Sequence, residues 1–287
     1  MLGITFIGSG SKGNAALLEL GRRFFLLDAG FSCKRIKEFL NQKGLDFSDL
    51  SGIFITHEHD DHIKGLRVLL GKNSEIPLYC SRGTFCALKS RGLETSRQID
   101  LVAGRELEIE GTRCVPFNVP HDATEPMGLR FENGGKIMSI ATDLGHITAE
   151  VLDNMKEADL LCVESNYDEG MLRSSIYPGW LKRRIRSPMG HLPNEGFRGI
   201  LSRMTRPPQV LALMHVSQES NSPRLVRETV EHFFGLNQER YAATKFSVAS
   251  QDLPGERLFV ETVLPKKLKN KMLLQKTFDN LLDGSIG

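Results

Sequence analysis

Histidine and aspartate side chains crowd one short segment of the chain. This segment, Thr56–His62, reads Thr-His-Glu-His-Asp-Asp-His and follows the apolar run 52–55, so we expect it to begin where a strand ends. Its possible metal ligands are His57, His59, Asp61 and His62. Imidazole and carboxylate groups together bind Zn²⁺, Mn²⁺ or Fe, and a packed cluster of them suits a hydrolytic centre with two metal ions. The segment therefore predicts metal-assisted hydrolysis.

Three more side chains of the same chemistry come after other strand-like runs. These are His121, Asp143 and His215. Because the ends of several strands can meet at one rim of a sheet, the three side chains can join the first cluster. A lone histidine would more often be a hydrogen-bonded structural residue, but here the cluster already requires partners. Glu58 and Asp60 alternate with the ligands, so we expect both to point away and to be structural.

The elements that would position these groups are short strands, followed by alternating strands and helices. The strand-like runs are 2–7, 15–20, 23–28, 52–55, 77–80, 105–109, 112–119, 128–132, 135–141, 158–163, 209–214, 245–249 and 257–262. The helix-like stretches are 33–42, 62–70, 82–91, 147–156, 178–186, 193–203 and 223–234. This order predicts an α/β protein in which helices cover two mixed sheets.

The composition is ordinary for a globular protein, with 40% hydrophobic and 25% charged residues among 287. The net charge of +2 gives no general attraction to nucleic acid, so any basic surface must be local. The five cysteines are an odd number and form no CxxC pair, which predicts reduced core residues. The chain starts on a strand-like run without a basic leader, and it has no apolar stretch of membrane-spanning length. These features favour a cytoplasmic protein.

The order of the ligand types resembles the five-motif signature of the metallo-β-lactamase superfamily. The matching residues are Asp28, His57, His59, Asp61, His62, His121, Asp143 and His215. The resemblance implies a four-layer αββα sandwich with a dinuclear site at one edge. We expect residues 1–264 to form this domain. Residues 265–287 would form a basic, amphipathic tail that packs as a helix, frays, or contacts nucleic acid or a partner protein.

The resemblance also implies a role for each ligand. It implies that one metal ion is held by His57, His59 and His121, and that the other is held by Asp61, His62 and His215. Asp143 would bridge the two ions. Asp28 would orient a ligand imidazole. Two ions about 4 Å apart can polarise a phosphoryl oxygen, activate water and stabilise the leaving oxygen, and Asp61 could orient or deprotonate that water. The true β-lactamases carry Cys in place of Asp143, so the resemblance favours phosphodiesterase or thioesterase chemistry.

Four further stretches resemble the YycJ (WalJ/VicX) group within this superfamily. They are 8–14, 164–168, 177–194 and 215–223. Members of this group are regarded as metal-dependent nucleases, usually with 5′→3′ exonuclease action on DNA. The resemblance therefore implies nucleic acid as the partner, with DNA favoured over RNA, and two divalent ions, Zn²⁺ or Mn²⁺, as cofactors.

A basic run beside an aromatic side chain gives a physical reason for such a partner. Next to Trp180 stand the cations Lys182, Arg183, Arg184 and Arg186. Cations neutralise phosphates, and an aromatic ring can stack on a base. The alternative is a solvated helix face with Trp180 in the core. The glycine-rich loop 8–14 could cradle a phosphate, with Ser11 and Asn14 lining the cleft, or it could be a tight turn.

His191 and Glu164 resemble a catalytic pair of RNA-processing relatives. His191 would protonate or stabilise the leaving oxygen, and Glu164 would orient the imidazole. The alternative for His191 is helix capping or a direct phosphate contact. We expect His146 to lie near the site but outside the ligand shell, and His232 to be structural.

Two other functions stay open. One is a small-molecule metallohydrolase with the same metal centre. It would act as a cyclic or signalling phosphodiesterase, or as a glyoxalase-II-like thioesterase. Such an enzyme would not need the basic run 182–186. A regulatory protein could keep the fold and bind a partner through its C-terminal helix, but it would not need every ligand. These motifs do not specify the metal or the oligomeric state.

Overall fold

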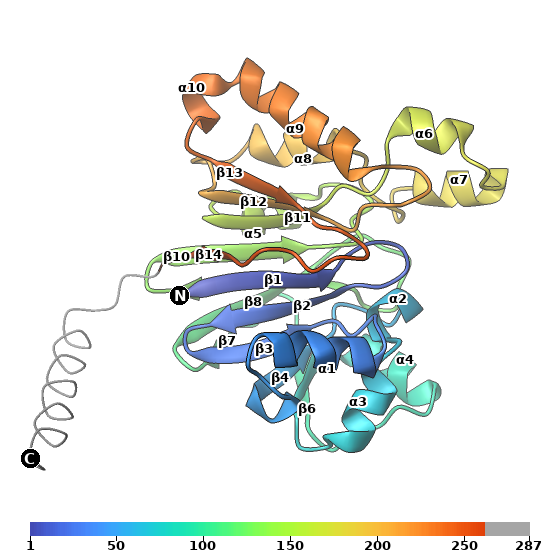
Figure 1. Cartoon of the computed structure of the whole chain (residues 1–287), viewed down its shortest axis with the longest axis vertical. Helices are drawn as coiled ribbons and strands as arrows, with labels where there is room; N and C mark the ends of the chain where they lie inside the picture. The colour runs from blue at the N-terminus through green and yellow to red at the C-terminus, as the bar shows by residue number, and fades with distance from the viewer. Residues whose placement is uncertain (262–287) are drawn as a thin grey trace, which may run out of the picture.

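Two seven-stranded sheets face each other and carry helices on their outer faces. The computed structural model describes residues 1–261, and Figure 1 shows the layers as helices, sheet, sheet and helices. This is the four-layer αββα sandwich that the resemblance to the metallo-β-lactamase superfamily implies. Among the described residues, no helix combines the length and the apolar character that a membrane crossing requires.

The strand order differs from the chain order in both sheets. From one edge to the other, the first sheet contains β14 (Leu258–Val260), β1 (Leu2–Gly8), β2 (Ala15–Leu20), β3 (Arg23–Leu27), β4 (Leu50–Phe54), β5 (Leu78–Ser81) and β6 (Gln98–Leu101). The second contains β13 (Lys245–Val248), β12 (Val210–Met214), β11 (Leu160–Glu164), β10 (Lys136–Ala141), β9 (Met127–Asn133), β8 (Thr112–Asn118) and β7 (Leu107–Ile109).

Each sheet is antiparallel on one side and parallel on the other. Strands β3 to β6 run parallel to one another in the first sheet, and β10 to β13 do so in the second. Parallel neighbours bring their carboxyl ends to one rim, where loops carry functional side chains. A candidate site residue stands at the carboxyl end of β3, β4, β8, β10, β11 and β12, in the order Asp28, His57, His121, Asp143, Glu164 and His215.

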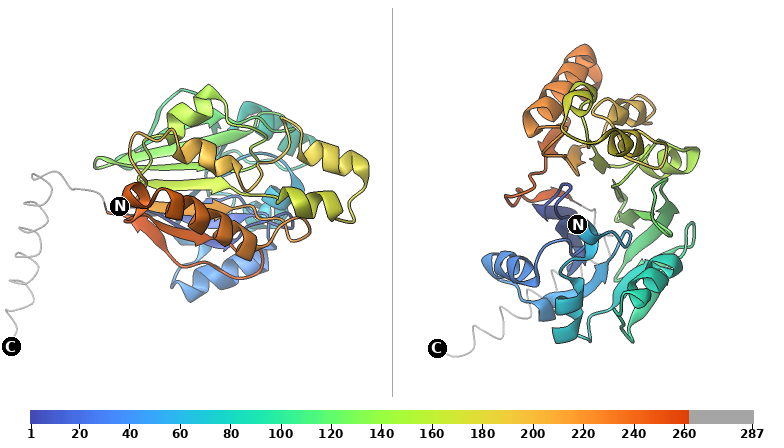
Figure 2. Two further views of the ribbon diagram at one scale, coloured as in Figure 1. Left: turned by 90° about the horizontal axis from the view of Figure 1, so that it is seen from above. Right: turned by 90° about the vertical axis from the view of Figure 1, so that its right-hand side faces the viewer.

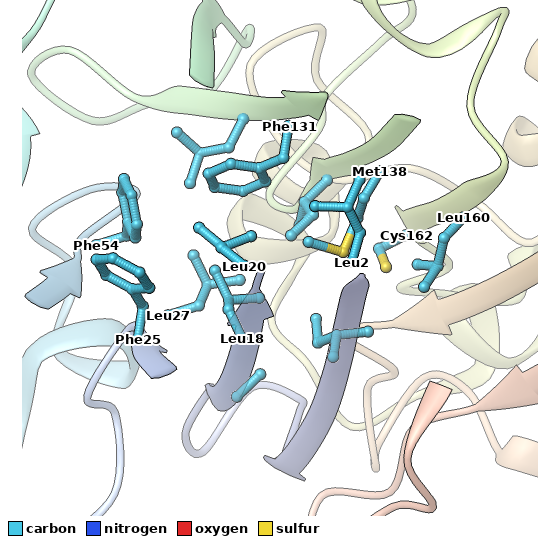
Figure 3. Close-up of a cluster of buried hydrophobic side chains, with 14 of the residues drawn as sticks. Leu2, Leu18, Leu20, Phe25, Leu27, Phe54, Phe131, Met138, Leu160 and Cys162 are labelled. Atoms are coloured by element: carbon cyan, nitrogen blue, oxygen red, sulfur yellow. The ribbon is translucent and has the colours of Figure 1, made fainter. Parts of the chain in front are cut away.

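The main core lies between the two sheets (Figure 3). Phe54 of the first sheet packs edge-on against Phe131 of the second, with ring centroids 5.4 Å apart. Leu2, Leu18 and Leu160 are completely buried in the same layer. Because helices cover the opposite faces, the central strands are buried on both sides, which explains their almost continuous apolar sequences.

The helices cover the outer faces in two groups. They are α1 (Cys33–Gln42), α2 (Asp60–Ile63), α3 (Leu66–Lys72), α4 (Arg82–Ser90), α5 (Ala149–Met155), α6 (Glu169–Ser174), α7 (Gly179–Ile185), α8 (Gly196–Leu201), α9 (Pro223–Leu236) and α10 (Gln238–Tyr241), with a 3₁₀ turn at Phe47–Asp49. Helices α1, α3 and α4 pack on the first sheet, and α5, α8 and α9 pack on the second. Helices α6 and α7 form a separate lobe with a small core of its own.

The prediction of one helix over 62–70 is wrong, because the structure has two helices there. The N–H of Gly65 donates to the carbonyl of Ala29 at 2.7 Å and so leaves the helical hydrogen-bond ladder. A side chain at Gly65 would place its Cβ 2.1 Å from the carbonyl oxygen of Phe31. The close passage of the loop after β3 therefore interrupts the helix at this glycine.

Several other features differ from the expectations. The sequence patterns do not predict β6, α6 and α10, which are four to six residues long. Cys80, Cys114 and Cys162 are buried free thiols as expected, whereas Cys33 is half-buried and Cys86 is exposed, so the core assignment is wrong for Cys86. The predicted boundary at 264 and the tail 265–287 lie outside the described residues.

Candidate metal centre

Three imidazole nitrogens converge at the rim where β4 and β8 end. Nδ1 of His59 lies 3.1 Å from Nε2 of His57 and 3.2 Å from Nε2 of His121. Zinc–nitrogen bonds of about 2.0–2.1 Å in a tetrahedral site place ligand nitrogens about 3.3 Å apart. The spacing of these three side chains therefore fits one divalent ion, and together they form the first ligand set.

A second ligand set lies beside the first. Oδ2 of Asp61 lies 3.5 Å from Nε2 of His62 and 3.5 Å from Nε2 of His215. His62 and His215 are almost completely buried, whereas Asp61 is partly exposed. Two imidazoles and one carboxylate at these distances can hold a second divalent ion.

Asp143 lies between the two ligand sets. Its Oδ1 is 3.5 Å from Nε2 of His121, and its Oδ2 is 3.2 Å from Nε2 of His62. One carboxylate oxygen thus faces each set. This arrangement suits a carboxylate that bridges two ions, which is the role that the sequence resemblance implies.

Three residues of the centre have a left-handed backbone, which L-amino acids other than glycine adopt uncommonly. The φ angles are 56° at Asp28, 51° at Asp143 and 54° at His215. At His215 the backbone is held on both sides, since its N–H donates to Oγ of Ser9 at 2.8 Å and its carbonyl accepts from Nδ2 of Asn166 at 2.9 Å. Such strain persists where surrounding contacts fix the conformation, and it is typical of functional sites.

Asp28 orients His62 from behind. Oδ2 of Asp28 lies 2.7 Å from Nδ1 of His62, and the backbone N–H of Thr56 donates to Oδ1 of Asp28 at 2.9 Å. The hydroxyl of Thr56 also donates to this carboxylate. With Nδ1 engaged in this way, Nε2 of His62 faces the second ligand set. A carboxylate behind a ligand imidazole is the arrangement found in many metal sites.

Charges of opposite sign are concentrated around the second ligand set. Burial alone would raise the pKa of Asp61, but His62 and His215 hold that pKa well below its ordinary value. Burial would lower the pKa of His62, and the carboxylates of Asp143 and Asp28 raise it well above the ordinary value instead. The buried carboxylates therefore require positive charge close by, which protons on the imidazoles or bound divalent ions supply.

Asn14 lies behind the second ligand set. Its Oδ1 accepts from the N–H of Gly10 at 2.9 Å, which directs its Nδ2 toward Asp61. Nδ2 lies 3.3 Å from Oδ2 of Asp61 and 3.1 Å from Nε2 of His62. Asn14 is 2% exposed. The glycine-rich loop thus presents a buried amide to the ligands, whereas Ser11 of the same loop lines the open cavity.

A buried carboxylate joins His191 to the ligand His215. Oε1 of Glu164 lies 2.8 Å from Nδ1 of His191 and 2.9 Å from Nδ1 of His215. Its Oε2 accepts from the N–H groups of Leu144 and Leu192. Burial alone would raise the pKa of Glu164, but the two imidazoles lower it. Since Nδ1 of each histidine faces Glu164, each Nε2 is directed to the other side of its ring.

These groups open into one cavity of about 230 Å³. Its walls are formed by Ser11, His59, Asp61, Asp143, Asn166, Tyr177, Leu181, Arg184, Ile185, His191, His215 and Ser217. Ligands of both sets, His191 and one face of α7 therefore share a single space. The sequence patterns do not single out Asn166, Ser217 or the apolar face of α7, although Asn166 and Ser217 lie in stretches that carry the family resemblance.

The structure divides the basic run on α7. Lys182 donates to the carbonyls of Arg173 and Ser175, and Arg186 pairs with Glu169 at 2.6 Å. Arg184 pairs with Asp122, a residue that no motif of the sequence singles out. Within residues 1–261, only Arg183 of the four cations makes no hydrogen bond or ion pair with its side chain.

Trp180 and the remaining polar side chains that the sequence singles out lie outside the ligand sets. Trp180 is 62% exposed, so the alternative of a core tryptophan is wrong. Glu58 is buried and accepts from Thr124, and Asp60 pairs with Arg91, so neither faces the ligands. Two histidines outside the ligand sets, His146 and His232, are exposed; Nδ1 of His146 lies 2.8 Å from the carbonyl of Pro188.

Comparison with known proteins identifies the family of this chain. The family model described as "Beta-lactamase superfamily domain" matches residues 23–216. The chain is 34% identical to Exodeoxyribonuclease YycJ of Bacillus anthracis, over 83% of this chain and 92% of that protein. It is 32% identical to Exodeoxyribonuclease WalJ of Streptococcus pneumoniae, over 79% of this chain and 86% of that protein.

Solved structures share the fold. The metallo-beta-lactamase fold protein YhfI from Bacillus subtilis superposes with a TM-score of 0.68 at 14% identity, covering 90% of this chain and all of that chain. Human tRNase Z, short form, superposes with a TM-score of 0.60 at 18% identity, covering 90% of this chain and 99% of that chain. The family model and the relatives above 30% identity establish that this chain belongs to the beta-lactamase superfamily, as a hydrolase of the metallo-β-lactamase fold with a histidine and aspartate cluster suited to divalent metals.

Proposed function

We propose that this protein is a metal-dependent exonuclease that hydrolyses DNA from the 5′ end. The observation that carries the proposal is the meeting of two ligand sets and the supported His191 in one cavity. DNA as the substrate class rests on the two relatives named exodeoxyribonuclease, which match this chain over 83% and 79% of its length. The 5′→3′ direction rests on the resemblance to the YycJ group.

The two ligand sets fit two divalent ions, Zn²⁺ or Mn²⁺. The first set would hold one ion and the second set the other, with Asp143 between them. When bound, such ions polarise the phosphoryl group, activate water and stabilise developing negative charge. Asp28 and Asn14 would keep His62 and Asp61 in place for this task.

Asp61 is the candidate general base. Its carboxylate is partly exposed and lines the cavity, so an attacking water can reach it. Its pKa lies well below the ordinary value because His62 and His215 are close, and it is therefore ionised at neutral pH. An ionised carboxylate can orient the water and accept its proton.

His191 is the candidate general acid. The bond of its Nδ1 to Glu164 leaves Nε2 on the opposite side of the ring, and the imidazole lines the cavity. An N–H at that position can donate a proton to the departing sugar oxygen, which is a poor leaving group without it. Glu164 acts through His191 and His215 and is a positioning residue.

Ser11 and Arg184, which line the cavity, are the candidate contacts for the strand that is cleaved. Trp180, on the same short helix as Arg184, is the candidate contact for the DNA duplex outside the cavity. Arg183 adds a cation without an ion pair among the described residues. We assign Lys182, Arg186 and Asn14 to the support of the lobe and of Asp61, because their side chains are engaged by the protein.

A small-molecule metallohydrolase is the second candidate. The cavity of about 230 Å³ is small, and three of the four cations of the run 182–186 are engaged by other protein groups. Both observations would suit a compact phosphodiester or thioester. The two named relatives and the exposed Trp180 favour the nuclease.

The test uses protein stripped of metal and reconstituted with Mn²⁺ or Zn²⁺. Matched DNA and RNA duplexes carry a label at the 5′ or the 3′ end, and Asp61→Ala is assayed beside the wild type. Stepwise degradation of DNA that is lost in Asp61→Ala is the expected result, and early release of the 5′ label would give the direction. Intact polymers together with cleavage of a small phosphodiester or thioester would support the second candidate instead.

A further inference from the structure

Two large apolar side chains, close together in the chain, are exposed on the lobe next to the cavity. Ile176 is 90% exposed, and Trp180, the only tryptophan of the chain, is 62% exposed. We call these two residues the apolar ledge. The lobe that carries them projects from the body at the rim where the parallel strands end (Figures 1 and 2). Their position beside the cavity makes these exposed apolar side chains candidates for contact with a bound molecule.

The two ledge residues stand next in the sequence to residues that line the cavity. Tyr177 and Leu181, the neighbours of the two ledge residues in the sequence, both line the cavity. They also pack against the small core of the lobe, which contains Ile185. The ledge residues take no part in that core. Their side chains are therefore exposed on the surface of the lobe.

The charges around the ledge favour a base over a phosphate as its occupant. Lys182 and Arg186 are engaged by backbone carbonyls and by Glu169. Arg183 is the cation of α7 that remains without such a contact in the described part of the chain. A surface with two apolar side chains and one such cation can stack on the flat face of a base, while the cation contacts the adjacent backbone.

The cavity is compact, at about 230 Å³, and the lobe that carries the ledge forms part of its wall. A strand whose phosphate reaches Asp61 therefore passes close to the lobe, and its terminal base is still paired at that point unless the protein opens the duplex. We propose, resting on the proposed exonuclease function, that Ile176 and Trp180 form a wedge that stacks on the terminal base pair of duplex DNA and separates the strand to be cleaved.

The test compares two duplexes that differ only at one end. In one the terminal base pairs are complementary, and in the other they are mismatched and already open. Wild type, Trp180→Ala, Trp180→Phe and Leu236→Ala are assayed as holoenzymes with Mn²⁺. Leu236 is 72% exposed at the end of α9 that leads into α10, and Figure 1 shows α10 far from α6 and α7; Leu236 serves as the matched control.

The expected result is a selective defect. Loss of one stacking ring slows degradation from the paired end by about 5- to 100-fold, whereas the open end is degraded within about 3-fold of the wild-type rate. Trp180→Phe keeps a ring and retains most of the paired-end rate, and Leu236→Ala behaves as wild type.

Equal slowing at both ends, or no slowing at the paired end, would overturn the wedge while leaving the exonuclease intact. Degradation of neither duplex by the wild type would instead contradict the proposed function, and the wedge with it. If the ledge binds a protein and not DNA, Trp180→Ala would keep the wild-type ratio of the paired-end rate to the open-end rate. That result would also count against the wedge.

Discussion

Arg184 donates two parallel hydrogen bonds to Asp122, from Nε to Oδ2 at 2.6 Å and from a terminal nitrogen to Oδ1 at 2.9 Å. Asp122 follows the ligand His121, and its Oδ1 lies 3.4 Å from Nε2 of that histidine. Arg184 belongs to α7 and lines the cavity. The pair therefore connects the lobe directly to the first ligand set.

Removal of Arg184 is expected to harm DNA binding by more than the loss of one cation. Burial would raise the pKa of Asp122, but Arg184 and the nearby histidines hold it below the ordinary value, so the carboxylate is ionised at neutral pH. In Arg184→Ala this negative charge would lose its guanidinium partner at the cavity and repel phosphate. We expect Kd to rise about 5-fold or more, and Asp122→Asn in the same chain to recover part of that loss. Additive effects in this double-mutant cycle would refute the coupling.

The salt dependence of DNA binding is expected to distinguish Arg183 from the other cations of the run 182–186. Arg183 is the one that can neutralise a phosphate without leaving a protein partner, whereas Arg186 is already paired with Glu169. We expect Arg183→Ala to reduce the slope of log K against log [salt] by about 0.7–0.9, and Arg186→Ala to leave it nearly unchanged. Binding titrations of the Asp61→Ala protein at several salt concentrations measure both. A larger change for Arg186→Ala would contradict the assignment.

Asp28 is expected to control metal affinity without binding metal. It holds His62 through Nδ1 at 2.7 Å. Loss of such a carboxylate partner weakens metal binding about 10- to 100-fold in other metalloproteins. We predict a change of that size for Asp28→Asn, measured by competition with a chelating dye, and none for Asp60→Asn, which alters a nearby carboxylate that is 91% exposed and paired with Arg91. Equal affinities in the two variants would refute the role of Asp28.

Most of the metal ligands can be predicted from the sequence, because they follow strands whose ends meet at one rim. Residues such as Asp143 and His215 follow apolar runs, and the parallel strands β10 to β12 bring the ends of those runs to one rim. The pairing of Arg184 with Asp122 was not predictable, since the two residues are 62 positions apart and Asp122 lies in a loop without a periodic pattern. The exposure of Trp180 was equally hidden, because a tryptophan on a helix is expected in the core unless the small size of the lobe is known.

The interruption at Gly65 has a similar cause. The local sequence continues the apolar pattern of a helix from 62 to 70, so the pattern alone predicts no break. The break is imposed by the loop after β3, which comes within bonding distance of the Gly65 N–H. The interruption of the helix thus depends on a contact between segments distant in sequence. In the local sequence, Gly65 is the one residue that indicates it.

The buried thiols are expected to resist modification. Burial raises the pKa of Cys80 and of Cys114 to about 12, and raises that of Cys162 further. Because the thiolate is the reactive form, thiols with raised pKa stay protonated and inert between pH 7 and 9. We predict that a disulfide reagent labels the exposed Cys86 quickly, the half-buried Cys33 slowly, and the other three only after unfolding. Mass mapping of the labelled protein reveals the order in which the cysteines react. Rapid labelling of Cys162 would contradict its position in the core.

Gly30 is predicted to be essential for the position of Asp61. Its N–H donates to the carbonyl of Asn14, whose own N–H donates to the carbonyl of Asp61 at 2.7 Å. A Cβ at Gly30 would lie 1.7 Å from that Asp61 oxygen and 2.5 Å from the nitrogen of Asn14. No rotation of a methyl group relieves contacts with two backbone atoms, so Gly30→Ala must displace the segment that carries Asp61.

We therefore expect Gly30→Ala to lower stability by about 1–3 kcal/mol and to lose metal from the second ligand set. Thermal unfolding and metal analysis of the purified protein measure the two effects. Gly235→Ala is the matched control, because a Cβ there meets no atom within 4 Å and the position lies in α9. Alanine in a helix is favoured over glycine by about 0.5–1 kcal/mol, so this variant should be as stable as the wild type or more so. A Gly30→Ala protein with full metal content and unchanged activity would mean that Asp61 does not depend on this close packing.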